Sequence, residues 1–107
     1  MARHGILLAG LLLALTPATA LADDDKSATA MPEAAASCLS CHGASGRPVL
    51  PEVPIIAGQQ PAYLERALKS YREGLRNGGP ALVMSGIAAD LSDEDIKALA
   101  QWFGEQR

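Results

Sequence analysis

The chain has 107 residues, enough for one domain at most, and a formal net charge of −3 at pH 7. Only 4% of the residues are aromatic, so large side chains that could fill a core are few. Because a nucleic-acid-binding domain carries a basic face, the acidic balance argues against a nucleic-acid partner.

The first 22 residues are typical of a secretory signal peptide. Arg3 and His4 precede an apolar run of ten residues, 6–15, and a small-residue pattern follows at 20–22. Ten helical residues rise about 15 Å, half of a bilayer core of about 30 Å, so the run is too short to span a membrane as a helix. Cleavage after residue 22 removes one of the nine basic residues and none of the twelve acidic ones, which makes the mature net charge −4. The mature chain is therefore expected to be exported, with no transmembrane span.

The mature chain begins with charged and small residues, and 23–31 are expected to form a flexible leader before a domain at 32–107. Pro32 suits the first turn of a helix, and Glu33 lies where a negative charge complements the helix dipole. Alanines continue this helix towards Cys38.

Two segments rich in glycine and proline, 43–58 and 76–86, are predicted to be loops. Between them, Pro61 starts a second helix with apolar residues at helical spacing, and Gly74 is a candidate stop.

The last helix has the clearest signals. Ser92 is a candidate N-cap and Asp95 occupies the capping-box position, after which an apolar stripe reaches Phe103. No segment shows the alternation of a strand, so the fold class is all-α, with about three to four short helices and long loops. Loops of this length are uncommon in a compact domain unless they have a function. A large apolar cofactor would explain them, since the loops could wrap around it, and it would fill the core that the few large side chains leave open.

The chemistry is concentrated in Cys38-Leu39-Ser40-Cys41-His42, which matches C-x-x-C-H, the attachment signature for c-type haem. One helical turn places both thiols on the same side, where they can add to the two vinyl groups of one porphyrin. His42 then lies beneath the iron as its proximal ligand.

Three other interpretations compete with haem attachment. A structural zinc site needs four ligands, and the mature chain has two cysteines and one histidine. A thioredoxin-like redox pair belongs to a βαβ unit, and no strand is predicted here. A disulfide between residues three apart would close almost no loop and stabilise little.

The sixth position on the iron has several candidates. Met31 lies seven residues before Cys38 and is expected on the same helix, which makes the far face of the haem difficult to reach. Met84 lies in the second predicted loop, from where its thioether can reach that face. A lysine, or no protein ligand, also remains possible from the residues alone.

The pattern "CLSCHG…PIIAGQ…YL…L…Y…G…R…M…LSDEDI…LA…WF" resembles the class I c-type cytochromes, and most closely their small bacterial periplasmic monohaem type. The resemblance implies a cytochrome c fold around one covalent haem c, with Cys38 and Cys41 as thioether links and His42 and Met84 as iron ligands. It also implies that the carbonyl group of Pro54 accepts a hydrogen bond from His42.

The resemblance makes Arg76 a candidate partner for a haem propionate, with a solvated charge as the equal alternative. It implies a periplasmic electron carrier rather than an enzyme. Its partners would be a membrane cytochrome complex, a terminal oxidase or a periplasmic dehydrogenase. The alternatives are a haem c subunit of such a dehydrogenase, for example one that oxidises sulfur compounds with a flavin, and a haem-based sensor.

Overall fold

The computed structural model describes residues 1, 5, 10, 12–15 and 29–107. The predicted cleavage site and most of the predicted leader lie outside these residues. No helix in the described part of the chain is long and apolar enough to cross a membrane.

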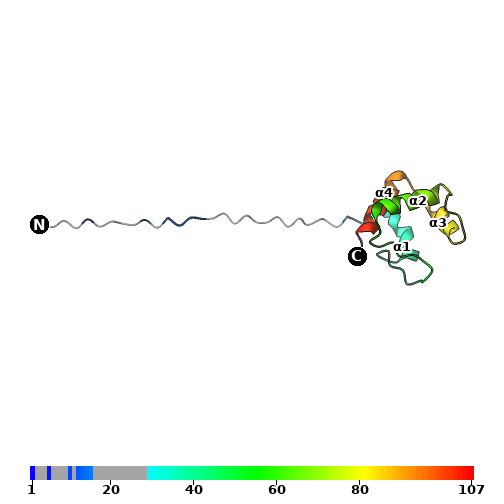
Figure 1. Cartoon of the computed structure of the whole chain (residues 1–107), viewed down its shortest axis with the longest axis horizontal. Coiled ribbons are helices and arrows are strands. Elements are labelled where there is room, and N and C mark those ends of the chain that lie inside the picture. Colours follow the sequence, from blue (N-terminus) through cyan, green and yellow to red (C-terminus); the bar gives the residue numbers. More distant parts are fainter. Residues whose placement is uncertain (2–4, 6–9, 11, 16–28) are drawn as a thin grey trace.

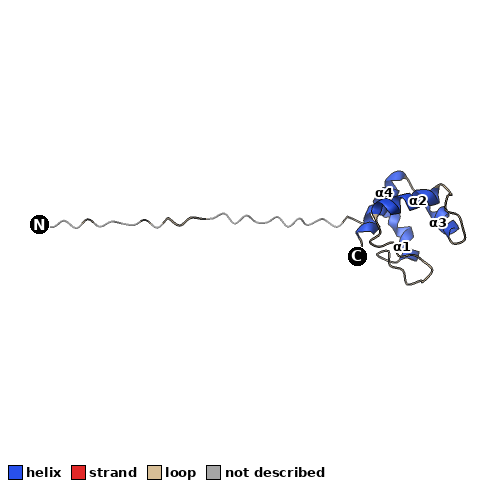
Figure 2. Cartoon of the chain, viewed as in Figure 1, coloured by secondary structure: helices blue, strands red, loops and turns tan. Residues whose placement is uncertain are grey.

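The described residues form helices and loops without a strand, as the sequence predicts (Figure 2). A 3₁₀ turn, η1 at Glu33–Ala35, leads into α1 at Ala36–His42. The other helices are α2 at Pro61–Arg72, α3 at Ala81–Ala88 and α4 at Asp93–Glu105. Figure 1 shows α2 and α4 side by side at one edge of the domain, with α1 and α3 approaching them from the same side.

The predicted starts and stops of α2 and α4 are confirmed. Pro61 is the first residue of α2, and Gly74 ends it in the left-handed conformation at φ 72°. In α4, the Ser92 hydroxyl accepts a hydrogen bond from the amide of Asp95, whose carboxylate accepts one from the amide of Ser92. This is the expected capping box.

Two expectations about the helices are wrong. The second predicted loop contains α3, because Gly78 and Gly79 precede the helix, Pro80 has a helical φ of −60° just before Ala81, and Gly86 is accommodated within the helix. Met84 therefore lies on a helix. At the other end of the domain, helical structure begins at Glu33, so Met31 precedes the helix rather than sharing it, and its side chain is half exposed.

The core is small and lies where α4 meets α2 and the N-terminal helical segment. Ala35 and Ile96 are fully buried, and the rings of Trp102 and Phe103 pack edge to face with centroids 4.8 Å apart. Many larger apolar side chains are exposed: Val49, Leu50, Ile55, Tyr63, Leu75, Leu82 and Val83. Three of them, Ile55, Tyr63 and Val83, line a cavity in the domain.

Candidate functional site

The C-x-x-C-H motif occupies the last turns of α1. Cys38 is buried and Cys41 is exposed, and both are free thiols. Burial raises the pKa of the Cys38 thiol, an effect that the neighbouring Ser37 partly offsets, so this sulfur stays protonated at neutral pH. Neither cysteine is in a disulfide, so both sulfurs are available to form bonds with a ligand.

The His42 ring is buried, with 6% of its surface exposed, and its Nδ1 lies 3.0 Å from the carbonyl oxygen of Pro54. A carbonyl oxygen only accepts hydrogen bonds, so Nδ1 carries the proton and donates it. In the neutral imidazole, Nε2 is then the nitrogen whose lone pair can bind a metal.

The loop that supplies the Pro54 carbonyl is fixed by its own backbone. The amides of Ile56 and Ala57 both donate to the carbonyl of Gly46, at 2.9 and 3.1 Å. Gly46 has φ 84°, and a Cβ there would come within 2.9 to 3.1 Å of Ala57 and of the Ile56 and Phe103 side chains. Only glycine fits this close approach. The glycines and prolines that predict a loop thus have a second role. Gly46 fixes the shape of the loop, and the Pro54 carbonyl of that loop holds the His42 ring in one orientation.

Two adjoining cavities, of about 200 and 170 Å³, lie next to the motif. Both are lined by Cys38, His42, Pro54 and Met84, so they are two parts of one slot. The remaining walls of the larger part are mostly apolar and come from α2, α4 and the loop before α2, with Ile55, Leu64, Leu68 and Phe103 among them.

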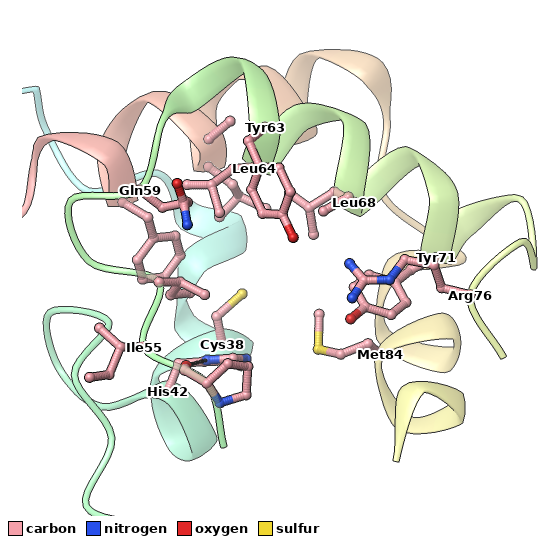
Figure 3. A pocket seen from close by; sticks show the side chains of 16 residues that line it. Cys38, His42, Ile55, Gln59, Tyr63, Leu64, Leu68, Tyr71, Arg76 and Met84 are labelled. Atoms are coloured by element: carbon pink, nitrogen blue, oxygen red, sulfur yellow. Dashed lines mark hydrogen bonds between the residues drawn. The ribbon is translucent and has the colours of Figure 1, made fainter. Parts of the chain in front are cut away.

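Met84 lies on the opposite wall from the motif. Figure 3 shows its thioether reaching from α3 into the cavity, across from Cys38 and His42. Met31 does not line either part of the slot. A nitrogen ligand and a sulfur ligand thus approach one apolar space from two different elements.

Arg76 lines the cavity beside Met84, with its guanidinium group 4.4 Å from the centre of the Tyr71 ring. Figure 3 shows this pair at the Met84 side of the cavity and Gln59 at the far side. Tyr71 and Gln59 also line the cavity, although the sequence did not indicate them as site residues. Tyr71 was indistinguishable from the rest of the apolar stripe of α2, and no motif marked Gln59 beyond the resemblance itself.

The slot fits a haem c better than the competing groups. Two thiols and an imidazole on one helical turn, facing a thioether across an apolar cavity, are the attachment and ligand groups of a covalent haem. No cluster of three or more His, Cys, Asp or Glu side chains that could hold a metal ion occurs among the described residues. A zinc site of four such ligands therefore has no support in this part of the chain.

Comparison with known proteins gives the same assignment. The sequence profile described as cytochrome c matches residues 29–105. Cytochrome c-554(548) of Halomonas halodenitrificans is 43% identical over 70 residues, which cover 65% of this chain and 84% of that protein. A thiosulfate dehydrogenase electron acceptor of Thiomonas intermedia is 34% identical over 70 residues, which cover 65% of this chain and 32% of that protein.

Among solved structures, reduced recombinant cytochrome c4 from Pseudomonas stutzeri matches with a TM-score of 0.61 and 38% sequence identity. The match covers 65% of this chain and 38% of that one. The chain thus spans most of the first relative but only about a third of the other two proteins.

Proposed function

Because the chain belongs to the cytochrome c family, and so binds one haem c covalently, we propose that it is a periplasmic electron carrier with His42 and Met84 as the two axial iron ligands. When bound, the haem supplies an iron that gains and loses one electron. The observation that carries the proposal is the placement of His42 and Met84 on opposite walls of one slot, with Cys38 beside it.

The α1 side of the slot has the groups that attach and orient. Cys38, which is buried, and Cys41, which is exposed, would form the two thioether bonds. The Pro54 carbonyl keeps the proton of His42 on Nδ1 and raises the basicity of Nε2, the nitrogen that would bind iron.

On the α3 side of the slot, Met84 would occupy the sixth coordination position of the iron. A thioether ligand stabilises the ferrous state and so raises the reduction potential. With both axial positions held by side chains, no position would remain for a substrate, which supports a carrier rather than an enzyme.

The predicted signal peptide at 1–22 supports export to the periplasm. The redox partners would be a membrane cytochrome complex, a terminal oxidase or a periplasmic dehydrogenase. The net negative charge favours a partner with a basic docking surface, so that association slows as salt is added.

The test is the optical spectrum of the exported holoprotein, oxidised and reduced, before and after carbon monoxide. We expect a haem c spectrum, a weak sulfur-to-iron charge-transfer band in the oxidised form, and no response to carbon monoxide. A Met84→Ala variant should lose the band and bind carbon monoxide, whereas Met31→Ala should behave as the wild type. Complete carbon monoxide binding by the wild type would overturn the proposal and favour a haem-based sensor.

A second candidate function is that of a haem c subunit of a periplasmic dehydrogenase. It is favoured by the similarity to proteins named as thiosulfate dehydrogenase electron acceptors, one of them 38% identical over 66 residues. Gel filtration of a periplasmic extract separates the candidates. A stable complex with a dehydrogenase indicates a subunit, and a lone monomer that the enzyme reduces in the presence of thiosulfate indicates a shuttle.

A further inference from the structure

Helix α3, which carries Met84, packs on α2 but buries few of its own side chains. Ala88 is its one buried residue, and Leu82 and Val83 are 60% and 62% exposed. No side chain caps its N-terminus, and it follows the flexible pair Gly78 and Gly79. A specific hydrogen bond can therefore add to the packing of α3 on α2 in fixing the position of Met84.

The residue after Met84 supplies a specific constraint. The Ser85 hydroxyl donates a hydrogen bond of 2.9 Å to the backbone carbonyl oxygen of Arg76. Within the described part of the chain, this is the one side-chain hydrogen bond that α3 donates. It closes residues 76–85 into a ring, so the Met84 backbone is tied to Arg76.

Arg76 is in turn fixed to the end of α2. The amide of Leu75 donates to the Ser70 carbonyl at 2.9 Å, and that of Gly74 to the Tyr71 carbonyl at 3.1 Å. These two bonds are a Schellman motif, which leaves the chain little freedom before Arg76. The Arg76 guanidinium stacks on the Tyr71 ring at 4.4 Å, a cation–π contact that holds its side chain as well.

We propose that Ser85 is a positioning residue for Met84: its hydrogen bond to Arg76 couples α3 to the end of α2 and keeps the thioether in the cavity. The inference rests on Met84 as an iron ligand. If it holds, the strength of this bond sets how often Met84 leaves the iron, and so how readily an external ligand can enter.

Imidazole binding to the oxidised holoprotein measures that opening. An external ligand that must displace Met84 binds with an apparent affinity proportional to the fraction of molecules in which Met84 has left. Ser85→Ala should bind imidazole about fivefold more tightly than the wild type, which corresponds to about 1 kcal/mol, the typical net value of one hydrogen bond.

A matched pair isolates the hydroxyl group from side-chain shape. Thr and Val share one shape in a helix, and only Thr can donate to the Arg76 carbonyl. Ser85→Thr should bind imidazole within about twofold of the wild type, and Ser85→Val should resemble Ser85→Ala. Ser70→Ala, on α2, removes a serine hydroxyl elsewhere but keeps the backbone carbonyl that accepts from Leu75, so it should leave imidazole binding unchanged.

A double-mutant cycle tests whether the effect passes through Met84. In a Met84→Ala background there is no thioether to displace, so adding Ser85→Ala should not change imidazole affinity. An equal affinity gain in both backgrounds would overturn the proposal, as would equal affinities for the Thr and Val variants. A wild-type protein without the sulfur-to-iron band would instead overturn the ligand assignment itself, so the two failures are distinguishable.

Discussion

The two walls of the slot are built differently. The His42 wall is rigid: the ring is buried and hydrogen-bonded to Pro54, and the loop behind it is closed by two bonds to the Gly46 carbonyl. The Met84 wall is a short helix, largely exposed, held by one side-chain hydrogen bond and the packing of α3 on α2. If His42 and Met84 bind iron as proposed, we expect His42 to stay bound and Met84 to be the ligand that an external molecule can displace.

The largest expected effect comes from a methyl group placed in the rigid wall. Gly43 has φ 80° and ψ 166°, a conformation that is essentially restricted to glycine. A Cβ there would collide with the carbonyl group of Arg47. Gly43→Ala should lower the free energy of unfolding by about 3 kcal/mol, measured by urea denaturation of the holoprotein.

Gly74→Ala is the matched control on the other side of the molecule. Gly74 has a similar φ of 72°, but a Cβ there would meet no atom within 4 Å. Only the conformational cost remains, about 1 kcal/mol. If Gly43→Ala and Gly74→Ala lowered the free energy of unfolding equally, the contrast between a rigid His42 wall and a more tolerant Met84 wall would be contradicted.

The next largest effect is expected where the segment that carries α3, residues 73–90, joins α2 and α4. Arg72, at the end of α2, donates to the Leu91 carbonyl at 3.0 Å and to the Asp93 carboxylate at 2.7 Å. It thus joins the two ends of the chain from 73 to 90. Because Asp93 is exposed to solvent, we expect Arg72→Ala to cost only about 1 kcal/mol, and to increase imidazole affinity as well. Arg66→Ala, an exposed residue of the same helix, is the control and should change neither quantity.

The same contrast separates what the sequence could predict from what it could not. Local signals were sufficient to predict where α2 begins and ends and where α4 begins. Pro61, Gly74 and the Ser92–Asp95 capping box each act on residues next to them in the sequence. The attachment motif is equally local. The helix around Met84 was missed because Gly78, Gly79 and Pro80 look like a loop, whereas Pro80 in fact begins a helix.

Contacts across loops were the other part that the residues alone did not reveal. The bond between His42 and Pro54 was expected only from the family resemblance, since three prolines were available in that loop. The hydrogen bond between Ser85 and Arg76 could not be predicted from the sequence. A serine in a helix has many possible partners, and every residue has a backbone carbonyl that could accept its hydroxyl proton.

A smaller change should strengthen the weaker wall. Gly86 lies within α3, and a Cβ there would meet no atom within 4 Å. Gly86→Ala should raise the free energy of unfolding by about 0.5–1 kcal/mol, because alanine favours the helix. Imidazole should then bind more weakly than to the wild type, by up to about fivefold. A stabilised protein with unchanged imidazole affinity would mean that α3 does not have to open for Met84 to leave.

The smallest effect is a dependence of stability on pH through Asp93. The hydrogen bond from Arg72, and then its positive charge, hold the pKa of this carboxyl below its ordinary value of 3.8. Its contribution to stability is therefore complete above that value and is lost as the pH falls through the lower pKa of the folded state. The wild type should be more stable than Asp93→Asn at pH 6, and the difference should shrink towards pH 3, as followed by thermal unfolding. In an Arg72→Ala background the difference should lose most of this pH dependence, because only the weaker attraction of Lys69 is left to lower the pKa of Asp93. If the full pH dependence persisted there, the Asp93 carboxylate would be stabilised by Lys69 and the N-terminus of α4, and Arg72 would act on α3 only through the Leu91 carbonyl.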